Sequence, residues 1–310
     1  MSQPRIVCVG HAALDRIYRV DDLPTGPTKM RALEHVVSGG GMAANAAATI
    51  ARLGGQVELW SRVGDDDAGV RIRRGLEVEG VDIRHVERFE SARSSTAAVI
   101  VDRAGRRMVI GNRDIDMPSD TSWLPLERLR DADVVLADLR WLEAVRAVFR
   151  HARSINVPTV LDADLGAREA LPELLALTDY AIFSEPALES FEPELDLKAR
   201  LDRVMLHGPR HAGVTLGEKG YFWRDPFGGG RRAAFDVSVV DTTGAGDAFH
   251  GAFAFGLAQK MAIGDCVRFA SATAALKCCR LGARAGLPDR AKVDAFIEDQ
   301  GDAPRTDANA

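Results

Sequence analysis

The sequence contains few cysteines, and their spacing indicates neither a metal site nor a disulfide framework. Four cysteines occur in 310 residues, at Cys8, Cys266, Cys278 and Cys279, without a CxxC pair or a histidine cluster beside them. Zinc sites and disulfide-rich secreted domains both need closely organised cysteines. We therefore expect reduced and mostly buried thiols.

Long apolar runs and an export signal are also missing. The longest apolar stretches, such as residues 252–258, fall well short of the roughly 18 to 20 residues that a membrane-spanning helix needs. Arg5 leads directly into a strand-like run, without the basic, apolar and cleavage regions of a signal peptide. These absences predict a cytoplasmic protein with no membrane partner.

Neither acidic nor basic residues are in large excess. Forty Lys and Arg residues stand against 45 Asp and Glu residues, for a net charge of -5, and the basic residues are scattered along the chain. Binding of nucleic acid usually needs a basic patch or stripe, so we do not expect a nucleic-acid partner. Any affinity for an anion must be local.

Short β-branched runs alternating with helix-like segments dominate the sequence. The alternation predicts a doubly wound α/β fold, in which helices cover both faces of a mostly parallel sheet. A chain of this length suits about two domains, or one large domain with an added element. The predicted strands are 5–9, 57–62, 133–137, 158–161, 180–183, 212–216 and 237–240, and the predicted helices include 42–53, 68–79, 142–154 and 248–259.

Two segments break the alternation, because they contain strand-like pieces without helices. We expect them to form a small β lid across the ligand crevice. Exposed strand edges are commonly protected by pairing, which favours a homodimer joined through the lids. The predicted core is 1–11, 38–85 and 112–300, the lid is 12–37 and 86–111, and 301–310 is a disordered tail.

Polar residues follow the ends of the predicted strands, where ligands bind in open α/β sheets. We predict a crevice lined by carboxylates, hydroxyls and one arginine. The residues at these ends are Gly10, Asp15, Asp138, Arg140, Asp162, Asp164, Ser184, Glu185, Thr215, Gly217 and Asp241.

The sharpest motif is DTTGAGDAF at residues 241–249. The small residues Gly244, Ala245 and Gly246 let backbone N–H groups face an anion, and the helix that follows adds its positive end. Asp247, in the first helical turn, could accept a proton from a hydroxyl that attacks a γ-phosphoryl group. Alternatively, Asp247 only caps the helix and the glycines only turn the chain.

These residues resemble the ribokinase-like, or PfkB, carbohydrate kinase family. The family's signature DTxGAGDxF matches residues 241–249 at every fixed position, and its N-terminal signature resembles residues 39–47 followed by 62–66. Matches run from residue 5 to about residue 290. The resemblance implies a ribokinase-like fold with a β lid and the ATP-dependent phosphorylation of a sugar hydroxyl.

The resemblance also implies a role for each matching residue. Asp247 would be the general base, with Gly244, Ala245 and Gly246 as the anion hole. Sugar hydroxyls would contact Asp15, Gly41 and Asn45, although Asn45 could instead only bond its helical neighbours. ATP, as its magnesium complex, would lie along Ser184, Thr215, Gly217, Gly220, Thr243 and Gly246.

One departure from the family concerns the metal. Family members often carry N-x-x-E near the metal and phosphates, whereas this chain has Ser184-Glu185-Pro186-Ala187. Glu185 is the nearest substitute for a metal contact made through water. A requirement for a monovalent cation is left open by the sequence.

A narrower resemblance concerns the substrate. Strings at 15–18, 62–67, 137–141, 183–186 and 274–278 are similar to those of bacterial 6-deoxy-6-sulfofructose kinases, a branch of the family. This similarity implies that Lys29, Arg140 and, in a shifted register, Asn112 face a sulfonate. A guanidinium suits this permanent anion because it is always charged and presents a planar fork of donors.

Three hypotheses follow. The chain could phosphorylate 6-deoxy-6-sulfofructose to its 1-phosphate, in the degradation of sulfonated sugars. It could instead act on a neutral ketose, ribose or a nucleoside, with Arg140 in a structural ion pair with Asp138 or Asp164 and Lys29 merely solvated. A catalytically idle, sugar-binding regulator is the third hypothesis, and the intact motif at residues 244–247 argues against it.

Overall fold

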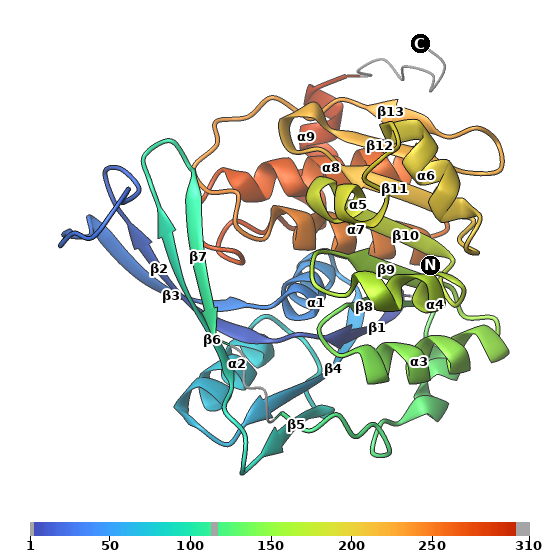
Figure 1. The fold of residues 1–310 in the computed structure, drawn as a ribbon, viewed down its shortest axis with the longest axis horizontal. Helices are drawn as coiled ribbons and strands as arrows, with labels where there is room; N and C mark the ends of the chain where they lie inside the picture. Colours follow the sequence, from blue (N-terminus) through green and yellow to red (C-terminus); the bar gives the residue numbers. More distant parts are fainter. Residues whose placement is uncertain (1–2, 113–116, 302–310) are drawn as a thin grey trace.

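The computed structural model describes residues 3–112 and 117–301. Within these residues the largest element is a nine-stranded sheet in the order β13-β12-β11-β10-β9-β8-β1-β4-β5 (Figure 1). The seven strands β11, β10, β9, β8, β1, β4 and β5 run parallel, and β12 and β13 extend the sheet with antiparallel pairs. The strands are β1 (Arg5–Gly10), β4 (Gln56–Gly64), β5 (Val86–Phe89), β8 (Val134–Asp138), β9 (Thr159–Ala163), β10 (Tyr180–Ser184), β11 (His211–Thr215), β12 (Tyr221–Arg224) and β13 (Gly230–Arg232).

Helices cover both faces of this sheet, because its central strands are apolar on both faces. In β1, Ile6 and Cys8 join one hydrophobic cluster and Val7 and Val9 join the other. One face packs against α1 (Met42–Arg52), α2 (Asp67–Val78), α7 (Ala245–Ala258), α8 (Ile263–Cys278) and α9 (Arg290–Asp299). The opposite face packs against α3 (Leu142–Ser154), α4 (Leu171–Leu175), α5 (Glu185–Phe191) and α6 (Leu197–Met205), and short 3₁₀ turns are η1 (Leu126–Asp131), η2 (Arg168–Ala170) and η3 (Gly217–Lys219).

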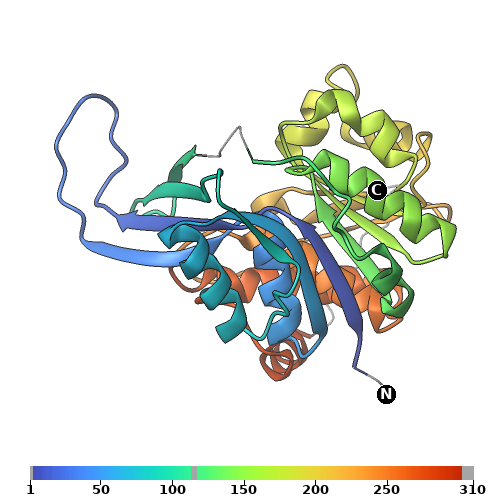
Figure 2. The ribbon, with the colours of Figure 1, turned by 90° about the horizontal axis from the view of Figure 1, so that it is seen from below.

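A second sheet, in the order β3-β2-β6-β7, projects from one side of the molecule (Figure 1). It consists of β2 (Ala13–Arg19), β3 (Glu34–Gly40), β6 (Ser95–Val101) and β7 (Arg107–Asn112). Its small core contains Ile17, Val99 and Val101. The chain passes almost directly from β1 into β2, and the long β2–β3 loop extends away from the core (Figure 2).

The predicted fold class is confirmed, and one predicted strand is wrong. Residues 237–240 form no strand in the described structure. The N–H groups of Val240 and Asp241 both donate to the carbonyl of Cys278, at 2.8 and 3.1 Å, so the segment is fastened to the end of α8. A Val-Ser-Val-Val run favours extended backbone, but its sequence does not show whether a partner strand lies beside it.

The other boundaries differ in detail. Residues 86–89, expected in the lid, pair with β4 as strand β5 of the large sheet. Helix α7 begins at Ala245 rather than at residue 248, and the antiparallel strands β12 and β13 were not predicted. Apart from Gly301, the predicted tail lies outside the described residues. None of the described helices combines the length and apolar character needed to cross a membrane.

Candidate active site

One buried carboxylate, Asp241, holds the loop that precedes α7. Its Oδ1 accepts a hydrogen bond from the N–H of Thr243 at 2.8 Å, and its Oδ2 accepts one from the N–H of Gly282 at 2.7 Å. Gly244 has a φ of 76°, and a Cβ at this position would lie 2.9 Å from the Cβ of Ala283. The loop therefore needs glycine at residue 244 and is packed against the chain that follows α8.

The start of α7 offers hydrogen-bond donors and space for an anion. The first N–H groups of a helix have no acceptor within the helix, and no described side chain caps this end. The N–H of Ala245 already donates to the carbonyl of Thr242 at 3.2 Å, whereas a Cβ on Gly246 would meet nothing within 4 Å. Thr243 Oγ1 is buried without a hydrogen-bond partner in the described part of the chain. An unsatisfied hydroxyl beside a positive helix end fits a phosphate group.

Asp247 lies in the first turn of α7, facing the start of α1. Its Oδ2 accepts a 2.7 Å hydrogen bond from Nδ2 of Asn45, a residue of α1 that is 4% exposed. The structure thus brings together two residues that lie far apart in the sequence and were assigned to base and sugar contact. Asp247 itself is partly exposed.

The surroundings of Asp247 raise its pKa to about 6. Burial is the main cause, and the carboxylates of Asp138 and Asp164 add to it. The hydrogen bond from Asn45 and the charge of Arg107 act in the opposite direction. A pKa in this range lets a carboxylate be ionised at neutral pH and still bind a proton during a reaction.

Asp15 reaches the same region from β2. It is 8% exposed, and its burial raises its pKa to about 6, while Arg284 lowers it. A Cβ on Gly40 would lie 2.3 Å from Asp15 Oδ1, and a Cβ on Gly41, whose φ is 90°, would lie 2.5 Å from the carbonyl oxygen of His11. These glycines therefore let Asp15 and the β1–β2 turn approach the N-terminus of α1.

The three side chains predicted to face a sulfonate make no hydrogen bond or ion pair with one another in the described structure. Arg140 follows β8, where its Nη1 donates to the carbonyl of Leu165 at 2.8 Å and its Nη2 lies 3.5 Å from Asp164 Oδ2. Asn112 ends β7 opposite Thr96, in the sheet row next to that of Asp15. Lys29 is exposed in the β2–β3 loop. Arg140 thus makes one of the ion pairs that the neutral-sugar hypothesis requires.

The residues assigned to the nucleotide follow β10 and β11. Ser184 Oγ donates to Asp164 Oδ1 at 2.9 Å and accepts from the N–H of Ala187, so this hydroxyl caps α5. Thr215 ends β11, and Gly217, with a φ of 58°, has open space where a Cβ would be. At Gly220 a Cβ would lie 2.0 Å from the carbonyl oxygen of Arg232. Glu185 Oε1 lies 3.9 Å from Nζ of Lys219, and the two side chains form an exposed ion pair.

The family is shown by comparison with known proteins. The sequence model of the pfkB family of carbohydrate kinases matches residues 3–290. This chain belongs to that family. An ATP-dependent ribose-1-phosphate kinase of Halopiger xanaduensis is 32% identical, over 96% of this chain and 99% of its own length. A ribokinase of Bacillus subtilis is 30% identical, over 94% of this chain and 99% of its own length. The structure of Arabidopsis thaliana ribokinase complexed with ribose and ATP has a TM-score of 0.82 at 26% identity, covering 96% of this chain and 99% of that one.

The pfkB-family match establishes the chemistry at a general level. The protein is a carbohydrate kinase that phosphorylates a small-molecule sugar with ATP. The two-sheet architecture agrees with the ribokinase-like fold.

Two arginines that contact the candidate site were not predicted from the sequence motifs. Arg284, 5% exposed, donates through Nε to Asn45 Oδ1 at 2.8 Å and through Nη2 to the carbonyl of Gly40 at 3.1 Å. Arg107 of β7 donates to Thr242 Oγ1 at 2.9 Å, which joins the small sheet to the loop before α7. The setting of Arg284 among small and apolar residues, Leu-Gly-Ala-Arg-Ala-Gly-Leu, was a signal for a buried arginine.

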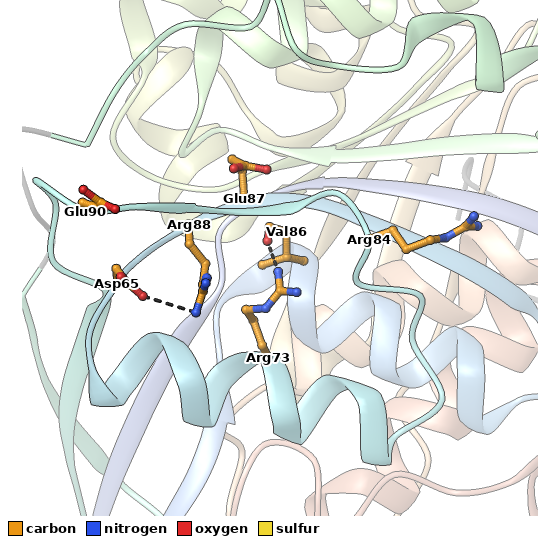
Figure 3. Close-up of a pocket in the computed structure, with 7 residues that line it drawn as sticks. All are labelled: Asp65, Arg73, Arg84, Val86, Glu87, Arg88 and Glu90. Atoms are coloured by element: carbon orange, nitrogen blue, oxygen red, sulfur yellow. Dashed lines mark hydrogen bonds and ion pairs between the residues drawn. The ribbon is translucent and has the colours of Figure 1, made fainter.

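A surface pocket elsewhere on the kinase is unrelated to these residues. It lies beside α2 and β5 and is lined by Asp65, Arg73, Arg84, Val86, Glu87, Arg88 and Glu90 (Figure 3). Arg88 pairs with Asp65 at 3.3 Å, and Arg73 donates to the carbonyl of Val86. Arg84, the third arginine, pairs with Asp82. The lining residues are not among the groups that act on Asp247 in the described part of the chain.

Proposed function

We propose that Asp247 is the general base for phosphoryl transfer from ATP to a hydroxyl group of the sugar. The observation that carries this proposal is the 2.7 Å hydrogen bond from Asn45 to Asp247 Oδ2, at the open N-terminus of α7. The other carboxylate oxygen, Oδ1, would accept the proton of the hydroxyl group. The anchored, partly exposed carboxylate also argues against an idle sugar-binding regulator.

In the proposed reaction the hydroxyl oxygen bonds to the γ-phosphorus as the bond to the β–γ bridging oxygen breaks, and ADP leaves. The N–H groups of Gly244, Ala245 and Gly246, with the positive end of α7, would stabilise the transferring group. Thr243 Oγ1 would donate to a phosphate oxygen, which would satisfy a buried hydroxyl that has no protein partner in the described residues. Asp15, Gly41 and Asn45 would hold the sugar, and Thr215, Gly217 and Gly220 would line the nucleotide.

We propose that the sugar is anionic, with 6-deoxy-6-sulfofructose as the specific candidate and its 1-phosphate as the product. Arg140 supports this, because its side chain is 20% exposed and is oriented by Leu165 and Asp164 beside the polar strand ends. A guanidinium held in place loses little entropy when it binds a sulfonate. Lys29 and Asn112, from the small sheet, would complete the contact when the lid lies over the sugar.

Ribose or ribose 1-phosphate is the second candidate substrate. It is favoured by two relatives, the ribokinase of Bacillus subtilis and the ribose-1-phosphate kinase of Halopiger xanaduensis, each at least 30% identical to this chain. If the substrate is ribose, which is neutral, the ion pair of Arg140 with Asp164 would have only a structural role. If the substrate is ribose 1-phosphate, Arg140 would bind its phosphate group.

A substrate screen with the purified protein tests this proposal. ATP turnover is measured with 6-deoxy-6-sulfofructose, fructose 6-phosphate, fructose, ribose, ribose 1-phosphate and adenosine at equal concentrations. We expect the highest kcat/KM for the sulfonated ketose. A higher value for ribose or ribose 1-phosphate would replace the first candidate by the second, and a higher value for fructose or adenosine would contradict the anionic substrate.

We propose that ATP is used as its magnesium complex, with the ion held mainly by phosphate oxygens. In the described part of the chain, no group of three or more His, Cys, Asp or Glu side chains is arranged to hold a metal. The buried amino group of Lys277 donates to the carbonyl of Asp241 at 2.8 Å, at the start of the loop that precedes α7. Because this donor is already present, we expect little change in kcat when K⁺ is replaced by tetramethylammonium.

We also propose that the small sheet is a lid and a dimer interface. Its edge strands β3 and β7 and the β2–β3 loop carry exposed apolar side chains, which a second copy could cover. These residues are Met30, Leu33, Val37, Met108, Val109 and Ile110. Since ATP is an intracellular phosphoryl donor, we place the reaction in the cytoplasm.

A further inference from the structure

Three successive glycines, two at the end of β3 and one at the N-cap of α1, each leave room for a different group in the candidate site. A Cβ on Gly39 would lie 2.2 Å from Nη1 of Arg284, one on Gly40 would meet Asp15, and one on Gly41 would meet the backbone of His11. The place of Gly39 is thus explained by a side chain that lies 245 residues later in the chain. The absence of a Cβ at Gly39 therefore leaves room for the guanidinium of Arg284.

Arg284 determines which way the amide of Asn45 points. A guanidinium can only donate hydrogen bonds, so its Nε must face the carbonyl oxygen of the Asn45 amide, and the 2.8 Å distance fits this assignment. The NH₂ group of the same amide then faces Asp247 Oδ2, at 2.7 Å. With the arginine in place, the reversed amide is excluded, because it would set an NH₂ group against a guanidinium.

The contacts also hold Arg284 itself. Its Nη2 donates to the carbonyl of Gly40 at 3.1 Å, and its side chain is buried between β3, α1 and the loop after α8. The charges that act on Arg284 are those of Glu79, Asp15 and Asp247. Those that act on Asp247 include Asp138, Asp164 and Arg107, and Asp162 and Lys277 also interact with it. Arg284 is therefore a buried cation in a site where carboxylates prevail.

We propose that Arg284 is a positioning residue of the kinase, which orients the Asn45 amide so that Asp247 is held with one oxygen bound and the other aimed at the sugar hydroxyl. This inference rests on the proposed role of Asp247 as base. It assigns Arg284 an effect on the reaction through Asn45 rather than by contact with the sugar. Groups that orient metal-binding side chains change activity by about 10-fold to 100-fold when they are removed, and we expect an effect on the same scale for Arg284.

The pH dependence distinguishes positioning from simple packing. Asp247 must be ionised to accept a proton, so kcat/KM should fall as the pH drops through a pKa of about 6. The hydrogen bond from Asn45 lowers the pKa of Asp247. If Arg284→Met loses this hydrogen bond, the acid limb of the pH profile, where kcat/KM falls as the pH drops, should move to higher pH. Arg284 also lowers the pKa of Asp15, so part of the movement could come from Asp15.

A double-mutant cycle separates these contributions. We would measure pH profiles of kcat and kcat/KM for Arg284→Met, Asn45→Ala and the double variant, with Arg224→Met as the matched control. Arg224, like Arg284, donates to one side-chain oxygen, here that of Asp202, and to one backbone carbonyl, that of Gly228, but it lies on β12 of the large sheet. If the inference is right, Arg284→Met lowers kcat about 10-fold or more and moves the acid limb, and most of both effects disappears in the Asn45→Ala background. The control should keep the wild-type profile.

Effects of the two substitutions that simply add, or an unchanged acid limb in Arg284→Met, would overturn the inference. If Arg284→Met fails to fold, Arg284→Lys decides the question, because a lysine keeps the charge but cannot reproduce the fixed geometry of both hydrogen bonds. Lysine should then restore stability but not the wild-type acid limb, and a wild-type limb would count against positioning. The role of Asp247 is tested separately, since a near-normal kcat in Asp247→Asn would refute the proposed base whatever Arg284 does.

Discussion

At the scale of single residues, the site combines carboxylates that are hard to ionise with cations that are fixed by neighbouring oxygens. Asp15 and Asp247 both have pKa values raised to about 6, chiefly by burial. Arg284 and Arg140 are each held by at least one backbone carbonyl. Under the proposed mechanism, Arg284 acts on the base through Asn45, whereas Arg140 acts on the substrate.

Arg140 gives the residue-scale prediction on specificity. A hydrogen bond to a charged group contributes about 1.5 to 3 kcal/mol, so Arg140→Ala should lower kcat/KM for 6-deoxy-6-sulfofructose by roughly 10-fold to 150-fold. The value for fructose should fall far less, because a neutral ketose offers no charge to this guanidinium. Steady-state kinetics with both sugars measures the difference, and Arg146→Ala on α3, whose partner is Glu173, is the control. Equal losses for both sugars, or a collapse of Tm, would make Arg140 a structural ion-pair residue.

At the scale of elements, the sequence predicted those strands and helices that a local apolar pattern and segment length determine. The strands β1, β4, β8, β9, β10 and β11 and the helices α1 to α3 show clear apolar periodicity, and each was found close to its predicted place. The segment 237–240 was misassigned because β-branched residues favour extended backbone whether or not a partner strand is present. Arg284 was missed for a related reason, since its partner Asn45 lies 239 residues away and no local pattern reports such a contact.

The small sheet supports an element-scale prediction. A lid that closes over the sugar would exclude water and order its own strands, so saturating substrate should slow hydrogen exchange of amides in β2, β3, β6 and β7. The strand β9, which is buried in the large sheet, should show no change and serves as the internal reference. Unchanged exchange in all four strands at saturating sugar would rule out lid closure. The contact of Arg107 with Thr242 suggests that β7 responds most strongly.

At the scale of the whole molecule, one exposed sheet edge needs an explanation. The small sheet ends at β7, where Val109 and Ile110 are 55% and 61% exposed. If two copies pair through this region, Val109→Asp together with Ile110→Asp should weaken the dimer, because burying the new charges is unfavourable. Sedimentation equilibrium measures the change, and Val78→Asp, at an 81% exposed residue of α2, is the control. A wild-type protein that stays monomeric at all concentrations would contradict the dimer.

The central claim is most directly tested by the kcat of Asp247→Asn. Asparagine preserves the shape of the side chain and a hydrogen bond with Asn45 but cannot accept the hydroxyl proton as a carboxylate does. With the best sugar from the substrate screen, kcat should fall by about 10² to 10⁴ fold, the scale of a lost general base, while ATP binding and Tm change little. A kcat close to that of the wild-type enzyme would show that Asp247 is not the base of this kinase.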